Sequence, residues 1–513
     1  MSASYWQSSA NIRTFPRIFR HAHCDVVVIG GGLTGITAAY LLKREGRRVF
    51  LLDRARLATG DTWHTTAHLT CVTDKRLTEL VKTFGDDHAR AVWDAGLAAI
   101  WQIAETVRDE RIACGFDWVS GYLHLPVIGA ERSDSDAEDL RHEAAVAADL
   151  GFDAHFTERA PFVDRPAVEY PNQARFDPRK YLRALVEEID GNGSAIFENS
   201  AVTSITDAPL TVVADGYRIN CDRVVVATHN PIVGKAGVLN ATLLQTKLAL
   251  YSSYAVAARV AKGQVADALF WDTADPYFYQ RLVPEHGHDV VILGGEDHKT
   301  GQERLTEGRM AALEKALHTM IPDAEVHERW SGQVIETNDG LPYIGEMAPH
   351  QFAATGFSGN GMTFGTVGAM MARDWVLGTG NPWSDLFDLR RTKVRGGLWD
   401  YLKENKDYPY YIIRDRFAGA QGKSTRSIPR NGGRVIELEG RQVAAYRHDD
   451  GTVTLRSATC THMGCRVNWN ESQHTWDCPC HGSRFSPTGD VLAGPAEKAL
   501  AEIEVEHQVP NRR

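Results

Sequence analysis

The stretch VVVIGGGLTG, residues 26–35, decides the fold. Its four apolar residues have the composition of a strand that is buried on both faces of a parallel sheet. Glycines follow at once, and apolar residues then recur at helical spacing as far as Gly46, where a helix can end. A second strand is predicted over residues 48–52 and ends on Asp53. This order of elements predicts a β-α-β unit.

The spacing of these glycines fits a dinucleotide-binding turn. Gly30 permits the tight turn, Gly32 lets the backbone approach a pyrophosphate, and Gly35 lets the helix pack closely on the strand. The phosphates would then lie at the positive end of the helix. Asp53 is placed to accept hydrogen bonds from ribose hydroxyls, and its charge would repel a 2′-phosphate. The alternative is a loop that is merely flexible, and the motif alone does not distinguish FAD from NAD.

Length and composition indicate a soluble protein with several domains. The chain has 513 residues, of which 43% are hydrophobic and 24% charged. A formal net charge of −10 and a pI near 6.1 give no reason to expect nucleic acid or an anionic membrane as partner. No apolar run reaches membrane-spanning length, and residues 1–19 lack the apolar segment of a secretory signal. We therefore expect a cytoplasmic protein.

The cysteines are unevenly distributed. Four of the eight fall within residues 460–480. In a reducing compartment such clustering favours metal ligation or redox chemistry over a structural disulfide framework. The other four stand among apolar neighbours and are expected to be small buried residues: Cys24, Cys71, Cys114 and Cys221.

The clustered cysteines form a ligand pattern with two histidines. The pattern is C-x-H, then fifteen residues, then C-x-x-H, and its members are Cys460, His462, Cys478 and His481. Zinc could use the same four side chains, but it would leave the two remaining cysteines and the Gly-Ser after the second histidine unexplained. Over nearly all of its last 90 residues, the chain resembles the Rieske [2Fe–2S] proteins.

This resemblance assigns roles to the residues. The two cysteine ligands would hold one iron, and the two histidines would hold the other and raise the cluster potential. Cys465 and Cys480 match the pair that forms a disulfide between the ligand loops in the respiratory type, and residues 494–496 match the loop that covers the cluster. Ser483 keeps a hydroxyl for a cluster sulfur, but Phe485 stands where high-potential members have tyrosine. We therefore expect a potential below that of the respiratory proteins.

The first 380 residues resemble the D-amino-acid-oxidase-like family of FAD enzymes. Besides the glycine block, the resemblance rests on DRVVVAT (222–228), on RWSG (329–332) with TNDGLPYIG (337–345), and on GFSGNGM (356–362). It implies an α/β FAD-binding domain of the Rossmann-like, glutathione-reductase/D-amino-acid-oxidase type, with an interleaved α+β substrate domain. A small all-β Rieske domain would follow.

The resemblance also implies which residues contact the cofactor. The turn at residues 356–362 opens a helix expected over 363–377, and its free N–H groups would stabilise negative charge on the reduced flavin. His64 or His68 could bond to the flavin covalently, although an ordinary hydrogen-bonded histidine is the commoner case. The expected FAD contacts are Gly30, Gly32, Leu33, Thr34, Gly35, Asp53, Arg54, Thr59, Gly60, His64, Thr65, Val202, Ala227, Thr228, Gly340, Gly356, Gly359, Asn360, Gly361 and Met362.

Three parts of the chain are expected. Residues 1–383 would form the flavin enzyme, with FAD-binding parts at about 20–125, 170–245 and 325–383 and substrate-domain parts between them. Residues 384–424 mix charges, tyrosines and glycines and are predicted to be a connector. Residues 425–513 would form the Rieske domain, with strands predicted at 434–438, 442–447 and 453–457.

Substrate-binding candidates alternate along a strand predicted over 277–282. Tyr277, Tyr279 and Arg281 would share one face, where a guanidinium with phenolic hydroxyls could hold a carboxylate. The alternative is an edge strand that faces solvent. The polar run at 294–299 is placed at the rim of the active site, or is simply a turn.

These observations predict an FAD-dependent oxidoreductase that acts on an amine or amino acid. Its electrons would leave one at a time through the Rieske cluster to an unidentified redox partner or acceptor. No catalytic base is assigned, because the family generally removes hydride from a neutral amine. Two alternatives stay open: an electron-transfer flavoprotein that receives electrons through the Rieske domain, and a cluster with a structural or redox-sensing role.

The purified protein should contain non-covalent FAD together with two irons and two labile sulfides per chain, the content of one [2Fe–2S] cluster. Metal and sulfide analysis and EPR of the reduced protein check this. The EPR signal should have an average g below the free-electron value. Stoichiometric zinc without such a signal would contradict the cluster assignment.

Overall fold

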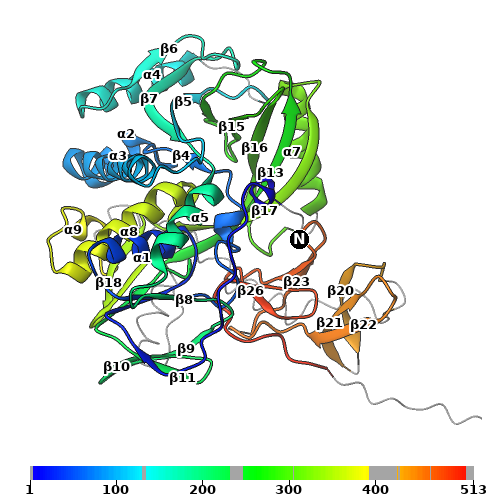
Figure 1. Cartoon of the computed structure of the whole chain (residues 1–513). Coiled ribbons are helices and arrows are strands. Elements are labelled where there is room, and N and C mark those ends of the chain that lie inside the picture. Colours follow the sequence, from blue (N-terminus) through cyan, green and yellow to red (C-terminus); the bar gives the residue numbers. More distant parts are fainter. Residues whose placement is uncertain are drawn as a thin grey trace, which may run out of the picture. The chain divides into compact units, whose positions relative to one another are not determined.

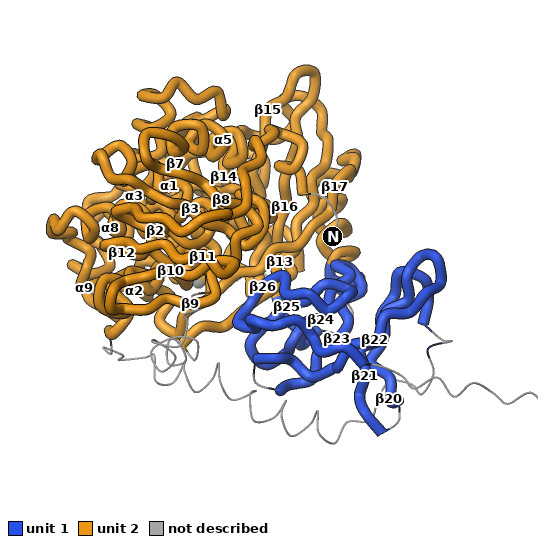
Figure 2. The backbone as a smooth tube through the Cα atoms, turned by 60° about the horizontal axis from the view of Figure 1, so that its bottom comes forward, with its two compact units in different colours: residues 1, 298–309, 402–513 blue, residues 2–297, 310–401 orange. Residues whose placement is uncertain are grey.

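The computed structural model describes residues 4–129, 134–230, 247–303, 306–391, 425, 428–438, 440–462 and 464–503. The chain divides into two compact units, shown in different colours in Figure 2. The larger unit comprises residues 2–297 and 310–401, and the smaller unit comprises residues 1, 298–309 and 402–513. Most of the connector predicted over 384–424 lies outside the described residues.

A six-stranded sheet forms the centre of the larger unit (Figure 1). Its order is β18 (Tyr343–Ala348), β19 (Gln351–Thr355), β12 (Arg223–Val226), β2 (Val26–Ile29), β3 (Val49–Leu52) and β8 (Ala195–Phe197). All neighbours are parallel except β18 and β19. Every residue of β2 and β3 is buried, which explains their unbroken apolar sequence. The strands predicted from VVVI and from residues 48–52 are confirmed.

Helices cover this sheet through one large apolar core. Helix α1 (Leu33–Arg44) packs against α8 (Gly361–Leu377) and α5 (Pro178–Ile189), and α8 packs against α3 (Asp86–Asp109). The side chains of Ile36 and Val367 are fully buried in that core. The helix predicted over 363–377 is confirmed. Three further helices are α2 (Leu77–Phe84), α4 (Asp134–Asp149) and α9 (Ser384–Phe387).

A small four-stranded sheet shares a second core with the central sheet. Its order is β1 (Ala22–His23), β11 (Tyr217–Asn220), β10 (Leu210–Ala214) and β9 (Val202–Asp207). Val212 and Ile219 are buried here with Val27 and Val224 of the central sheet. Short 3₁₀ turns occur at η1 (Tyr5–Ser8), η2 (Asp61–Trp63) and η3 (Ser358–Asn360).

The third sheet of the larger unit has nine strands. Its order is β17 (Glu325–Thr337), β13 (Leu248–Val260), β16 (Asp289–Lys299), β15 (Tyr279–Pro284), β14 (Leu269–Asp272), β5 (Asp117–His124), β7 (Ala167–Arg175) and β4 (His68–Leu69), and β6 (His155–Thr157) pairs with β7. Leu313 and Leu317 of α7 (Thr306–Met320) are buried in one core with Val256 and Val291.

This sheet excludes two alternatives that the sequence left open and corrects the start of one strand. Strand β15 pairs with β14 and β16 on its two sides, so the alternative of a solvent-facing edge strand is wrong. The strand begins at Tyr279, which leaves Tyr277 in the preceding loop. The run at 294–299 is not a turn, because β16 continues through it to Lys299. A strand reads as a turn here because its end is polar and rich in glycine.

The smaller unit contains two antiparallel sheets, as the predicted all-β domain requires. One consists of β20 (Gly433–Leu438), β21 (Arg441–Arg447) and β22 (Val453–Ser457), and the other of β23 (Asn468–Asn470), β24 (Thr475–Asp477), β25 (Arg484–Phe485) and β26 (Val491–Ala493). Trp476 and Phe485 are fully buried in its core beside the ligand cysteines. Among the described residues of the whole chain, no helix has the length and apolarity needed to cross a bilayer.

Candidate active site and metal centre

The glycine turn after β2 is built around close main-chain approaches. Gly30 has φ +106°, and a Cβ there would lie 2.5 Å from the carbonyl oxygen of Ala227 at the end of β12. A Cβ on Gly35 would lie 1.8 Å from the carbonyl oxygen of Gly30. Only glycine fits at these positions. Gly32 is the N-cap of α1 and offers no side-chain cap, so the turn presents main-chain groups at a helix N-terminus, the arrangement that suits a pyrophosphate.

Asp53 lies directly after β3 and holds this turn in place. Its carboxylate accepts hydrogen bonds from the main-chain N–H groups of Gly31 (2.6 Å) and Ala55 (2.7 Å). Burial raises the pKa of Asp53, while these two donors oppose the shift. A carboxylate has about four acceptor positions. The geometry therefore fits the expected ribose contact and adds a structural role that the sequence did not reveal.

A second glycine turn opens helix α8, and a short segment after β4 holds it. The N–H of Gly359 donates to Asp74 (2.7 Å), and the side chain of Asn360 donates to the carbonyl oxygen of Val72 (2.9 Å). A Cβ on Gly359 would lie 2.8 Å from the Asp74 carboxylate. Sequence analysis missed Asp74. The signal available was a lone acid directly after the run LTCVT at 69–73, which has the composition of a strand.

Asp74 belongs to a group of acids and tyrosines on the nine-stranded sheet and its loops. The Tyr277 hydroxyl donates to Asp74 (3.1 Å), and the Tyr279 hydroxyl lies 2.6 Å from the Ser253 hydroxyl. The two tyrosine rings are 5.5 Å apart. Burial raises the pKa of Asp297 to about 7, while a hydrogen bond with Ser253 opposes the shift. We name this group, Asp74, Ser253, Tyr277, Tyr279 and Asp297, the acid–tyrosine cluster.

The carboxyl of Asp74 combines two properties. The residue is exposed to solvent, yet desolvation by the surrounding protein raises its pKa. Its carboxyl therefore lies where protein surrounds it but small molecules can still reach it. Such a carboxyl takes up a proton more readily than one in water, and it can also bind a cationic ligand.

Arg281 does not join the two tyrosines. Its side chain is fully buried, its Nη1 donates to the carbonyl oxygens of Ala67 and Phe176, and its guanidinium lies 5.3 Å from the ring centre of Trp6. Burial lowers the pKa of Arg281 to about 9. The expected carboxylate clamp is therefore not supported by this geometry. Residues two apart on a strand share a face, but sequence cannot show what lies opposite that face.

The two histidines near the turn, His64 and His68, make different contacts. His68 is engaged at both ring nitrogens, with the Thr66 hydroxyl at 3.2 Å and the Gln280 carbonyl oxygen at 3.1 Å. Burial lowers its pKa to about 3, so the ring is neutral. The geometry of His68 is that of an ordinary hydrogen-bonded histidine. The main-chain oxygen of His64 accepts a hydrogen bond from Trp330 (2.9 Å).

The smaller unit gathers the four predicted cluster ligands. Cys460 and Cys478 are buried, and their thiols interact, which raises the pKa of Cys478. The rings of His462 and His481 are 4.9 Å apart. Burial and the neighbouring His462 lower the pKa of His481 to about 4, so its imidazole is neutral, the form that binds metal. Two adjacent thiols and a pair of neighbouring neutral imidazoles are the donor set of a Rieske cluster.

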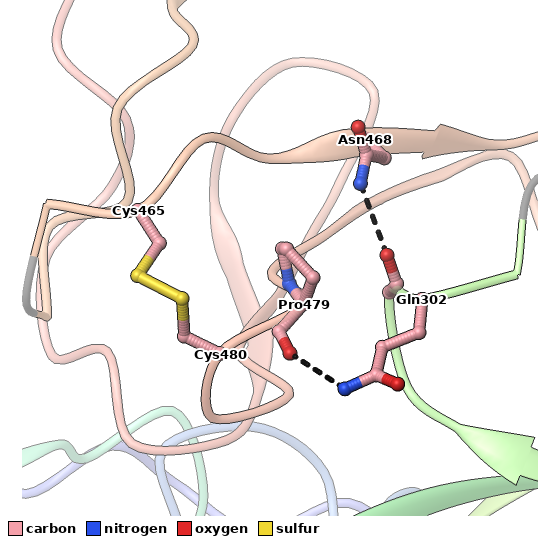
Figure 3. The surroundings of a disulfide bond; sticks show 6 residues. Gln302, Cys465, Asn468, Pro479 and Cys480 are labelled. Carbon is pink, nitrogen blue, oxygen red and sulfur yellow. Dashed lines mark hydrogen bonds between the residues drawn. A yellow bond between two sulfur atoms is a disulfide. The ribbon is translucent and has the colours of Figure 1, made fainter. Parts of the chain in front are cut away.

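Local bonds shape the two ligand loops. The disulfide between Cys465 and Cys480 is formed and joins them (Figure 3), which confirms the predicted pair. In the second loop, Cys478 N donates to the Ser483 carbonyl oxygen (2.8 Å) and Gly482 N donates to the Cys478 carbonyl oxygen (2.9 Å). The Ser483 hydroxyl oxygen accepts a hydrogen bond from Ala496 N (3.1 Å), which ties the covering loop to the ligand loop.

A buried ion pair closes the base of the second ligand loop. Asp477 precedes Cys478, Arg484 follows Ser483, and both charged side chains are buried. Nε and Nη2 of Arg484 donate to the two carboxylate oxygens of Asp477 at 3.1 and 3.2 Å. Asn470 and Thr475 also donate to this carboxylate. Sequence analysis missed the pair, although its two charges flank the ligand segment.

Comparison with known proteins agrees with both sites. The family model described as FAD dependent oxidoreductase matches residues 25–375, and the Rieske [2Fe-2S] domain model matches residues 423–504. The chain belongs to the FAD-dependent oxidoreductase family. It ends in a Rieske domain, and its cofactors are FAD and a [2Fe–2S] cluster.

Three relatives illustrate how this oxidoreductase is assembled. YhfW of Bacillus subtilis, described as a Rieske 2Fe-2S iron-sulfur protein, is 31% identical over 508 residues, or 98% of each chain. A cytochrome b6-f complex iron-sulfur subunit of a Nostoc species is 53% identical over 45 residues, 9% of this chain and 25% of the subunit. Glycine oxidase of Geobacillus kaustophilus has the same fold, with a TM-score of 0.60 at 18% identity, over 72% of this chain and 99% of that enzyme.

The buried ion pair yields a prediction. Asp477→Asn leaves the Arg484 guanidinium buried without its counter-charge, which should cost about 3 kcal/mol of unfolding free energy and lower the iron content. Thermal unfolding and iron analysis check this. Asp490→Asn is the matched control, because Asp490 is exposed and accepts hydrogen bonds from nearby hydroxyls. Equal stability and iron content in the two variants would remove the role given to the pair.

Proposed function

We propose that this oxidoreductase oxidises the C–N bond of an amine or amino acid and passes the electrons one at a time through its Rieske cluster to an acceptor. The observation that carries the proposal is the direct contact between the acid–tyrosine cluster and the glycine turn that opens α8. By family resemblance that turn faces the flavin. Polar groups at this place suit a small nitrogen-containing substrate.

The residues of this cluster would bind and orient the substrate. Asp74 is fixed by Gly359 N and by the Tyr277 hydroxyl, so its free acceptor positions have a defined direction. Asp297, whose pKa is raised to about 7, changes charge near neutral pH. A cationic amine would be attracted by the two carboxylates, and the tyrosine rings would pack beside its carbon skeleton.

The two cofactors divide the redox work. When bound, FAD accepts a hydride from the carbon next to nitrogen, and the cluster carries the two resulting electrons singly. The substrate loses one proton as well, and the imine that results is hydrolysed to a carbonyl compound. The chain contributes position and charge: the first turn holds the pyrophosphate, and Cys460, His462, Cys478 and His481 hold the cluster.

Removing the cluster should separate substrate oxidation from electron exit. In Cys478→Ser the cluster should be lost while FAD stays bound, since the glycine turns lie in the other unit. A compound that bleaches the flavin of the wild type without oxygen should still bleach the variant, but turnover with a one-electron acceptor should collapse. Cys114→Ser, at a buried cysteine of the larger unit, is the control. Wild-type turnover in Cys478→Ser would take the cluster off the path.

The cluster acids predict the pH dependence of binding. Asp297 is neutral below its pKa of about 7 and negative above it, so affinity for a protonated amine should rise as the pH passes through 7. Asp297→Asn should remove this rise and weaken binding at pH 8 roughly tenfold. Anaerobic titration of the flavin spectrum with an amine from the bleaching screen measures it. Asp272→Asn is the control, because that carboxylate accepts main-chain hydrogen bonds from Ala274 and Phe278. An unchanged pH profile in Asp297→Asn would contradict the assignment.

A further inference from the structure

Residues 298–309 belong to the Rieske unit although they come from the middle of the flavin enzyme's sequence. The segment takes in the last two residues of strand β16 and the first four residues of α7. Figure 2 shows the segment in the colour of the smaller unit, and the contacts within that unit define it. The cluster-binding unit is therefore assembled from two stretches of sequence that are far apart.

Three hydrogen bonds connect the segment with Pro479 in the second ligand loop and with Asn468 and Ser472, which lie between the two ligand loops. Asn468 Nδ2 donates to the carbonyl oxygen of Gly301 (3.0 Å), and Gln302 Nε2 donates to the carbonyl oxygen of Pro479 (3.4 Å). Figure 3 shows both bonds beside the disulfide of Cys480. Ser472 N donates to the Thr306 hydroxyl at 3.3 Å. Each of these bonds reaches across more than 160 positions of the chain.

Gly301 touches the main chain of a cluster ligand. Its φ is +79°, and a Cβ there would lie 2.6 Å from the carbonyl carbon of Cys478 and 2.6 Å from the nitrogen of Pro479. Both atoms are main chain, so they could not swing aside as a flexible side chain would. The peptide that joins the iron ligand Cys478 to Pro479 therefore rests directly on Gly301.

We propose that Gly301 and Gln302 are positioning residues for the iron–sulfur cluster. The disulfide restrains the 478–480 loop through Cys480, and the segment 301–302 restrains the peptide of the ligand itself and the carbonyl of Pro479. Groups that orient metal ligands tune both metal affinity and redox potential. A displaced Cys478 peptide moves its thiolate and changes the hydrogen bonds around the cluster, and both changes alter the potential.

The competing explanation is that Gly301 is needed only for packing. Comparing Gly301 with a second glycine, Gly263, distinguishes packing from a positioning role. Gly263 has φ +75°, and nothing lies within 4 Å of a Cβ placed there. Gly263→Ala therefore imposes nearly the same backbone strain as Gly301→Ala without any contact with a ligand loop. Gln264→Ala is the control for Gln302→Ala, because it removes side-chain hydrogen bonds with Asp323 (2.7 Å) and Ala261 N (3.0 Å), neither of which involves a ligand loop.

The test uses the full-length protein with both cofactors. Gly301→Ala should shift the EPR g values and the reduction potential of the cluster, with FAD content unchanged, and Gly263→Ala should leave all three as in the wild type. Gln302→Ala should lose iron to a chelator about tenfold faster, the effect of one lost hydrogen bond to a buried group. Gln264→Ala should lose iron at the wild-type rate.

Each outcome of these measurements either supports or overturns the positioning role. If the EPR spectrum and potential of Gly301→Ala match those of Gly263→Ala, the positioning role is overturned. If Gly301→Ala fails to fold, as shown by loss of FAD as well as iron, Gln302→Ala and Asn468→Ala decide. Wild-type potential and iron retention in both of these would overturn the proposal, and altered values in either would support it.

Discussion

The approach of three main-chain segments at Gly30, Gly35 and Ala227 is the constraint on which the larger unit depends. With no side chain between them, helix α1 stands directly on the end of β2, and β12 lies against the same turn. This contact fixes where the helix N-terminus opens at the carboxyl ends of the parallel strands, the place where such sheets bind ligands. Any larger residue would separate the helix from the sheet and open the core that α1 shares with α5 and α8.

A glycine also permits close main-chain packing at the iron centre. Sequence alone predicted the packing at residues 26–35 but not the packing at Gly301. The glycines of residues 26–35 lie within one short motif, so their spacing alone indicates close packing. Gly301 serves a similar purpose against Cys478, yet the two are 177 positions apart and nothing local marks the glycine as special. Sequence patterns report local geometry well. They report a contact between distant segments only when a motif already describes both.

The difference between local patterns and distant contacts also explains which other predictions from sequence were right and which were not. Buried parallel strands carry their own signal, and β2 and β3 were predicted within a residue or two. The Cys/His ligand pattern is also local, because its four members lie within 22 positions of the sequence. Arg281 was assigned from strand alternation, which gives its face but not its neighbours, and those are the carbonyl oxygens of Ala67 and Phe176. Asp74 was missed because its importance comes from Gly359, on a turn almost 300 residues further along the chain.

The ligand chemistry of the smaller unit bears on the direction of electron flow. Phe485 is fully buried and offers no hydroxyl to the cluster, whereas the Ser483 oxygen accepts from Ala496 N and keeps its own hydrogen to donate. Each missing donor destabilises the reduced cluster, because reduction adds negative charge that donors stabilise. A lower cluster potential decreases the driving force for electron transfer from the flavin to the cluster. It increases the driving force for transfer from the cluster to an acceptor. For the proposed exit of electrons through the cluster, such a potential suits an acceptor whose own potential is only moderate.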